Sequence, residues 1–307
     1  MSRTAYLFPG QGSQTVGMGR DYYERSAAAR ALVESADRLL GYPLSRLCFE
    51  GPEEELKLTQ NTQPALLLVS ALAALALDKD PDIAAGHSLG EYSALVAAGA
   101  LAFEDAILLV HKRGRYMQEA VPVGEGAMAA VIGLDLAAVR DGLARVPGGG
   151  VEVANWNSPE QIVISGRAAA VESALGILNA PRAVMLPVSA PFHSSLMKGA
   201  EERLAADLDA TPFRDPRFPV VTNVDAKPIR TGVEARDALK RQVSRPVLWQ
   251  PSMEVLREEG VDRFVEVGPG KVLTTLIKRI ARPWGTPVTA LSADGWEAAE
   301  RARAALS

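Results

Sequence analysis

The chain has 307 residues, of which 23% are charged and 48% are hydrophobic, and its formal net charge is −4. This composition is typical of a globular protein with a sizeable core, and the length favours about two domains. The net charge leaves no excess of positive charge for binding a phosphate backbone, so we expect no nucleic acid partner. The single cysteine, Cys48, excludes an internal disulfide and a multi-cysteine metal site, and it favours a reducing compartment.

Two apolar segments bear on membrane association. Residues 1–8 meet Pro9 and Gly10 before they can form the long apolar stretch of a secretion signal. The most apolar run, 64–77, is about 14 residues long, which is short for a bilayer span and fits a buried helix. We therefore expect a cytoplasmic protein with no membrane partner.

Strands and helices are expected to alternate in the first part of the chain. The pattern predicts strands at 4–8 and 82–85, with helices at 26–40, 64–77, 90–98 and 105–119. The strands are short and apolar and have glycines beside them. Such alternation predicts a parallel α/β sheet with helices on both faces.

The pattern changes after the segment 122–126. We expect strands at 127–133, 151–154, 161–165 and 183–188 and helices at 135–145 and 168–179, with a turn at Asn157-Ser158-Pro159. This βαββαβ order is that of the ferredoxin-like unit. We therefore predict a small subdomain, 124–189, inserted into a larger one formed by 1–123 and 190–307.

The last part of the chain returns to alternating elements. We expect helices at 195–208, 234–243, 252–259 and about 271–280, and strands at 219–222, 263–267 and 288–291.

The sharpest local motif is Gly86-His87-Ser88-Leu89-Gly90, which follows a short apolar strand and precedes a helix. This is the setting of a G-x-S-x-G nucleophile elbow, in which a tight turn exposes the serine. The alternative is an ordinary strand-to-helix turn with a capping serine. The helix start beneath the serine would favour the negative charge that develops in acyl transfer.

A nucleophilic serine needs a base, and the chain has three histidines. His87 is adjacent to Ser88, so its side chain should point away and serve as a structural or pocket-wall residue. His111 lies in a predicted helix among apolar residues and is expected to be packed or on the surface. His193 lies in a loop, 189–195, between the predicted insert and a helix, so elimination favours it as the base. No aspartate stands out as a third member, and a carbonyl oxygen could orient the imidazole instead.

Arg113 shares the edge of the apolar face that Val110 and Met117 form on the helix predicted at 105–119. Such an arginine can form a bidentate pair with a substrate carboxylate. It could also pair with a local acid such as Glu119, or extend to water. The neighbouring Gly114 indicates either close packing or close approach of a ligand.

Several segments together resemble the malonyl-CoA:acyl carrier protein transacylases of fatty acid synthesis. The matching segments are 8–14 (FPGQGSQ), 61–65 (NTQPA), 86–91 (GHSLGE), 113–118 (RGRYMQ), 155–159 (NWNSP), 191–195 (PFHSS) and 266–271 (EVGPGK). They cover nearly the whole chain in order. The resemblance implies an α/β-hydrolase-like core with a parallel sheet, a ferredoxin-like insert, and an active site between them.

The resemblance also implies catalytic roles. Ser88 would be the nucleophile and His193 its base, with the backbone N–H groups of Gln11 and Leu89 forming the oxyanion hole. Gln242 matches the position whose carbonyl orients the histidine. We expect Ser88 and His193 to face each other across a cleft, with the Arg113 guanidinium at its far end.

The same resemblance implies a substrate pocket. Arg113 would bind the malonyl carboxylate, and Gln63, His87 and Asn155 would be pocket residues. Phe192, just before the histidine, resembles the malonyl-selective form of the family, in which a smaller residue accompanies methylmalonyl use. One methyl group in an apolar pocket is worth only about 1–3 kcal/mol, so this selectivity should be partial.

The expected substrate is malonyl-CoA and the expected partner is an acyl carrier protein, with no metal and no permanently bound cofactor. The alternatives are a serine thioesterase or hydrolase, which would share Ser88 and His193, and a non-catalytic carrier-docking module. Lys271, Lys278 and Arg279 are a candidate basic patch for an acidic carrier protein, or else a solvated helix face.

Overall fold

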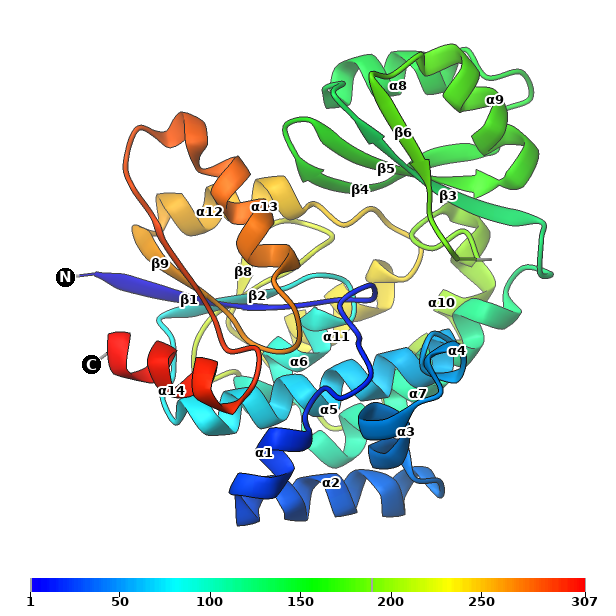
Figure 1. The fold of residues 1–307 in the computed structure, drawn as a ribbon. Coiled ribbons are helices and arrows are strands. Elements are labelled where there is room, and N and C mark those ends of the chain that lie inside the picture. The colour runs from blue at the N-terminus through cyan, green and yellow to red at the C-terminus, as the bar shows by residue number, and fades with distance from the viewer. Residues whose placement is uncertain (1, 189, 307) are drawn as a thin grey trace.

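The computed structural model describes residues 2–188 and 190–306. Residue 189, at which the predicted insert ends and the predicted loop 189–195 begins, lies outside the described residues, as do residues 1 and 307. The described chain forms two separate sheets, one of six strands and one of four (Figure 1).

The six-stranded sheet has the order β10-β9-β1-β2-β7-β8. All neighbouring pairs are parallel except β7 with β8, which is antiparallel and adds an edge strand that the sequence pattern did not predict. The strands are β1 (Arg3–Phe8), β2 (Ile83–Gly86), β7 (Val220–Val221), β8 (Pro228–Ile229), β9 (Val261–Glu266) and β10 (Thr289–Ser292).

Helices cover both faces of this sheet, as expected (Figure 1). Ala5 and Leu7 of β1 share one apolar cluster with α12 (Trp249–Glu258) and α13 (Val272–Ile280). Tyr6 and Phe8 point to the other face and share a cluster with α5 (Thr59–Leu77), α6 (Gly90–Ala97) and α7 (Phe103–Glu119). The alternation of successive side chains along a strand thus builds two cores.

The remaining helices of this larger part include short ones that were not predicted, α1, α3 and α4, and the C-terminal α14. Their bounds are α1 (Arg20–Arg25), α2 (Ala27–Leu40), α3 (Leu44–Glu50), α4 (Glu53–Leu56), α10 (Lys198–Ala210), α11 (Gly232–Gln242) and α14 (Trp296–Ala305), with 3₁₀ turns η1 (Ser195–Met197) and η2 (Arg282–Trp284). The predicted helix 195–208 therefore begins as a 3₁₀ turn.

Helix α5 begins at Thr59 and not at Pro64, because a proline is tolerated in a helix when the carbonyl it leaves without a donor finds another partner. That carbonyl belongs to Gln60, and Nδ1 of His111 lies 3.0 Å from its oxygen. His111 is half-buried and packs on the Tyr42 ring. Its contacts are those of a packed histidine.

Helix α5 is long and apolar enough to cross a membrane, but 67% of that stretch is buried in the molecule, as in the core helices of globular proteins.

The four-stranded sheet is antiparallel, with the order β4-β5-β3-β6, and has its own apolar core with α8 and α9. Its elements are β3 (Gly126–Ile132), α8 (Leu136–Ala144), β4 (Val151–Ser158), β5 (Gln161–Arg167), α9 (Ala168–Leu178) and β6 (Arg182–Met185). Strand β4 continues through the predicted turn at 157–158. The expected two-part α/β fold with a ferredoxin-like second sheet is confirmed.

Backbone hydrogen bonds join the two parts of the molecule. Val247 of the larger part exchanges backbone hydrogen bonds with β4, through Trp156 N at 2.9 Å and Ala154 O at 2.8 Å.

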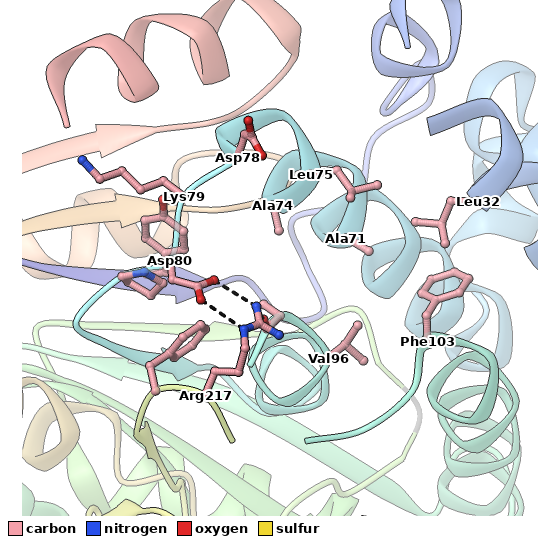
Figure 2. Close-up of a pocket in the computed structure, with 14 residues that line it drawn as sticks. Leu32, Ala71, Ala74, Leu75, Asp78, Lys79, Asp80, Val96, Phe103 and Arg217 are labelled. Carbon is pink, nitrogen blue, oxygen red and sulfur yellow. Dashed lines mark hydrogen bonds and ion pairs between the residues drawn. The ribbon is translucent and has the colours of Figure 1, made fainter. Parts of the chain in front are cut away.

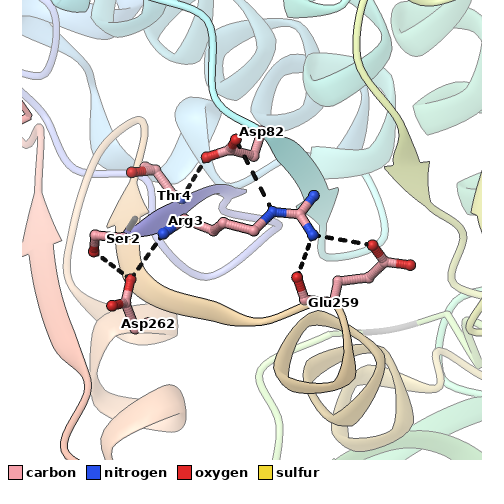
Figure 3. Close-up of polar contacts among 6 residues, drawn as sticks. All are labelled: Ser2, Arg3, Thr4, Asp82, Glu259 and Asp262. Atoms are coloured by element: carbon pink, nitrogen blue, oxygen red, sulfur yellow. Dashed lines mark hydrogen bonds and ion pairs between the residues drawn. The ribbon is translucent and has the colours of Figure 1, made fainter.

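At the start of β1, Arg3 pairs with Glu259 and Asp82, and the backbone N–H of Thr4 donates to Asp82 at 2.7 Å (Figure 3). These bonds anchor β1 between β2 and β9, and β1 and β2 in turn support the elbow that follows β2.

Candidate active site

Ser88 lies at the turn from β2 into α6, where the backbone has an uncommon conformation. Its φ angle is 51°, in the left-handed region that residues other than glycine rarely adopt and that is enriched at functional sites. A Cβ added to Gly86 would lie 1.9 Å from the backbone of Gly90, so only glycine permits this approach of helix to strand. The sequence thus builds the strained turn that a nucleophile elbow requires.

The Ser88 hydroxyl meets His193, as predicted. Ser88 Oγ lies 2.7 Å from Nε2 of His193, and Nδ1 lies 3.0 Å from the Gln242 carbonyl oxygen and 3.2 Å from that of Arg245. Because a carbonyl oxygen only accepts, the network assigns the proton to Nδ1 and leaves Nε2 free to accept from the serine. His193 also has a positive φ of 58°, so both members of the pair are held in strained backbone.

Burial keeps His193 neutral. The side chain is buried, and this desolvation, followed by the charge of Arg113, lowers the pKa of His193 to about 3. A neutral imidazole with a free Nε2 can act as a base toward the serine. The two carbonyls replace the aspartate that the sequence lacked.

Arg113 is closer to the nucleophile than the expected far end of a cleft. Its Nη2 donates to Ser88 Oγ at 3.1 Å and to Gln242 Oε1 at 2.9 Å, and its Nη1 donates to Gln63 Oε1 at 2.9 Å. The side chain is 1% exposed, and burial lowers its pKa. Within residues 2–188 and 190–306 it has no ion pair with a carboxylate.

The surroundings of Arg113 and Gly114 decide between the alternatives that the sequence left open. Glu119, the local acid considered for Arg113, pairs with Arg115 and Arg203 instead. Arg113 does not extend to water either. A Cβ on Gly114 would lie 2.6 Å from the Thr59 carbonyl oxygen, so the close crossing of α7 and α5 explains the glycine. What is left is a buried cation, a group that proteins keep paired or reserve for an anion.

These groups share one small cavity of about 110 Å³. The predicted residues that line it are Gln11, Gln63, His87, Ser88, Leu89, Arg113, Asn155, Phe192 and His193. Gln242 lies just behind it and reaches it through His193 and Arg113. In the part of the chain that the structure describes, the N–H groups of Gln11 and Leu89 have no protein acceptor, which leaves both available to an oxyanion.

Known proteins of one family resemble this chain over most of its length. A family model described as the acyl transferase domain matches residues 5–295. A malonyl CoA-acyl carrier protein transacylase of Bacillus subtilis (strain 168) is 50% identical over 291 residues, which are 92% of either chain. The chain belongs to the malonyl CoA-acyl carrier protein transacylase family.

Solved transacylases have the same fold. The enzyme of Coxiella burnetii superposes with a TM-score of 0.95 at 41% identity, over 99% of this chain and 97% of its own. A malonyl-transacylase solved in complex with its type II PKS acyl-carrier protein superposes with a TM-score of 0.95 at 43% identity, over 99% and 100% of the two chains.

The other histidine near the nucleophile forms part of the transacylase cavity wall. Nε2 of His87 lies 2.8 Å from Oδ1 of Asn157, and its ring packs on Trp249 with centroids 5.3 Å apart. Burial lowers its pKa. Asn155 lies in β4, where it forms a parallel β-bridge with Val247 of the larger part. The four-stranded sheet therefore contributes one side of the cavity.

Sequence reasoning missed two groups of residues. The apolar side chains that complete the cavity are Met117, Met128, Leu186 and Val188. Behind the cavity lie Glu91 and Asn223, both fully buried. Glu91 ends the segment 86–91 (GHSLGE), and a glutamate within a buried helix could have indicated a functional residue. Nothing in the sequence marked Asn223.

Other features of the molecule are separate from this site. A larger cavity of about 510 Å³ is open beside Asp80, which pairs with Arg217, and it contains none of the predicted site residues (Figure 2). Among the described residues no group of three or more His, Cys, Asp or Glu side chains has the arrangement of a metal site. Cys48 is buried, and this burial raises its pKa to about 12, as for an inert core thiol.

Proposed function

We propose that this chain transfers malonyl from malonyl-CoA to the phosphopantetheine thiol of an acyl carrier protein by a ping-pong reaction through an ester on Ser88. The observation that carries the proposal is the convergence of two groups on the Ser88 hydroxyl. Ser88 Oγ has a neutral imidazole at 2.7 Å and a buried guanidinium at 3.1 Å. The first activates the serine, and the second selects an acyl group that bears a carboxylate.

In the first half-reaction, His193 Nε2 removes the Ser88 proton as Oγ attacks the malonyl thioester carbonyl. The oxyanion is bound by the N–H groups of Gln11 and Leu89, and Arg113 pairs with the malonyl carboxylate. His193 then gives its proton to the departing coenzyme A thiolate. The carbonyls of Gln242 and Arg245 stabilise the imidazolium, because both accept from Nδ1–H.

In the second half-reaction, the thiol of the carrier's phosphopantetheine takes the place of coenzyme A. His193 removes the thiol proton, the thiolate attacks the Ser88 ester, and the same oxyanion site is used. The proton returns to Ser88 Oγ as the ester bond breaks, so the enzyme is unchanged at the end of the cycle. These steps use only side chains and backbone of this chain.

The experiment combines malonyl-CoA with a holo acyl carrier protein and measures both malonyl-carrier and free malonate. The proposal predicts malonyl-carrier as the main product, with its formation dependent on the phosphopantetheine thiol and lost in Ser88→Ala. Free malonate as the main product, at the same rate with and without carrier, would identify a hydrolase instead. Neither product, from a folded wild-type chain, would indicate a docking module.

The division of the chain supports the same proposal. We infer subdomains 1–123 with 190–307 and 124–189, because the second sheet runs from Gly126 to Met185 and has its own core. The cavity takes Ser88 and Arg113 from the first and Asn155 from the second.

Lys271, Lys278 and Arg279 are exposed on and beside α13, which fits a carrier-binding patch and a solvated face alike. Cytoplasmic location and the absence of a resident cofactor stay predictions.

A further inference from the structure

Glu91 is a buried acid beside the active site that the proposed reaction does not use. It stands in the first turn of α6, three residues after Ser88, and is 1% exposed. Its Oε2 accepts two hydrogen bonds, one from the backbone N–H of Asn223 and one from Nε2 of Gln242, each at 2.9 Å. Burying a carboxylate costs free energy unless it is paired and hydrogen-bonded, so these two bonds offset part of that cost.

The hydrogen bond from Gln242 to Glu91 controls the orientation of the Gln242 amide. Nε2 of Gln242 also donates to the Ser88 carbonyl at 2.9 Å, so two acceptors lie on its nitrogen side. The amide oxygen therefore faces Arg113 and accepts from Nη2 at 2.9 Å. A reversed amide would place its NH₂ against the guanidinium, donor against donor, and would leave the Glu91 oxygen without a donor.

The hydrogen bond from the Asn223 backbone to Glu91 controls the elbow. Asn223 accepts from the Ser88 N–H through Oδ1 at 2.7 Å and donates to the Gly86 carbonyl through Nδ2 at 2.6 Å. Its side chain thus holds both sides of the turn on which Ser88 has its positive φ. Strained backbone of this kind persists only where its surroundings hold it in place.

We propose that Glu91 is a positioning residue with two arms: through Gln242 it holds Arg113, and through Asn223 it holds the elbow that presents Ser88. The inference rests on the proposed function and deepens it, because the two arms serve different parts of the substrate. The Gln242 arm matters for an acyl group with a carboxylate. The Asn223 arm matters for every acyl group.

The test measures single-turnover acylation of Ser88 by malonyl-CoA and by acetyl-CoA in the full chain. Glu91→Leu keeps a side chain of similar size without an acceptor. It should slow both reactions and lower the malonyl-to-acetyl ratio by about tenfold or more, the usual effect of leaving buried donors unpaired. Glu91→Gln retains an oxygen that can accept both bonds and should restore most of the ratio. Asn223→Ala removes the side chain that holds the elbow and a longer bond of 3.4 Å from Gln242 Nε2, but it leaves the 2.9 Å bonds of Gln242 to Ser88 and Glu91. It should therefore slow both substrates by about the same factor.

An unchanged malonyl-to-acetyl ratio in Glu91→Leu would overturn the proposal. It would also be overturned if Glu91→Leu lowered this ratio as much in the Arg113→Ala background as in wild type, because Glu91 would then not act through Arg113. Failure of Glu91→Gln to restore the ratio would also refute the hydrogen-bonded arm. If Glu91→Leu does not fold by circular dichroism, Gln242→Leu removes the same arm and leaves the backbone carbonyl on His193, and it must lower the ratio likewise. Wild type without any malonyl ester would instead sink the proposed function, so the two failures are distinguishable.

Discussion

Replacing Arg113 by alanine should convert a malonyl-selective cavity into one that no longer prefers a carboxylate. The variant loses three donated hydrogen bonds, to Gln63, Gln242 and Ser88, and leaves two buried amide oxygens without a donor. Those losses affect every substrate. The loss specific to malonyl is the pairing of a buried cation with a carboxylate, worth about 2–5 kcal/mol, or about 30-fold to several thousand-fold in rate.

The assay compares kcat/KM for malonyl-CoA and acetyl-CoA in wild type, Arg113→Ala and Arg113→Lys. The malonyl-to-acetyl ratio should fall by at least about 30-fold in Arg113→Ala. Lysine keeps the charge without the planar fork, so its ratio should be intermediate. A proportional loss on both substrates would refute the reasoning and would assign Arg113 a structural role.

Three further predictions concern specificity, protonation and packing. Phe192→Ala should reduce the preference for malonyl-CoA over methylmalonyl-CoA by about tenfold or more, as measured by kcat/KM, and an unchanged preference would show that the ring does not exclude the methyl group. The pKa of His193 in the folded chain, about 3, lies below its ordinary value of 6.5, so the unfolded chain takes up a proton first as the pH falls. The contribution of this group to the free energy of unfolding is therefore lost between about pH 6.5 and pH 3. His193→Gln should therefore show a shallower fall of urea stability between pH 7 and pH 5 than wild type, whereas equal falls would contradict the burial of a neutral imidazole. Gly114→Ala should lower the free energy of unfolding by about 1 kcal/mol or more, because the clash of the new Cβ with the Thr59 carbonyl outweighs a gain of about 1 kcal/mol in helix propensity. A variant that is more stable than wild type in urea would contradict this packing.

The sequence predicted the fold where local pattern and tertiary structure agree. The structure contains the short apolar strand predicted before Gly86-His87-Ser88. It also begins a second sheet at Gly126, near the predicted change of pattern. Prolines were less reliable, since Pro64 lies inside α5 because His111 occupies the carbonyl that the proline frees. That compensation comes from another helix and has no local sign. The two-residue edge strand β8 was not predicted, because so short a segment carries no readable period, whereas β7 lies within the strand predicted at 219–222.

The candidate site was predictable as a set of residues and less so as an arrangement. With three histidines, elimination leads to His193, and the structure brings it to Ser88. The proximity of Arg113 to Ser88 depends on the crossing of α7 and α5 at Gly114, which no spacing along the chain determines. The buried connections of Glu91 and Asn223 join segments more than 130 residues apart, so they became visible only in the folded chain.

The central claim is that the hydroxyl of Ser88 carries the acyl group between the two thiols. Intact-protein mass spectrometry after brief mixing with malonyl-CoA, without carrier protein, tests it most directly, followed by peptide mapping of the adduct. We predict one malonyl group on the peptide containing Ser88, absent from Ser88→Ala and discharged when the carrier thiol is added. A folded wild-type chain with no adduct, or with the adduct on another residue, would contradict the account.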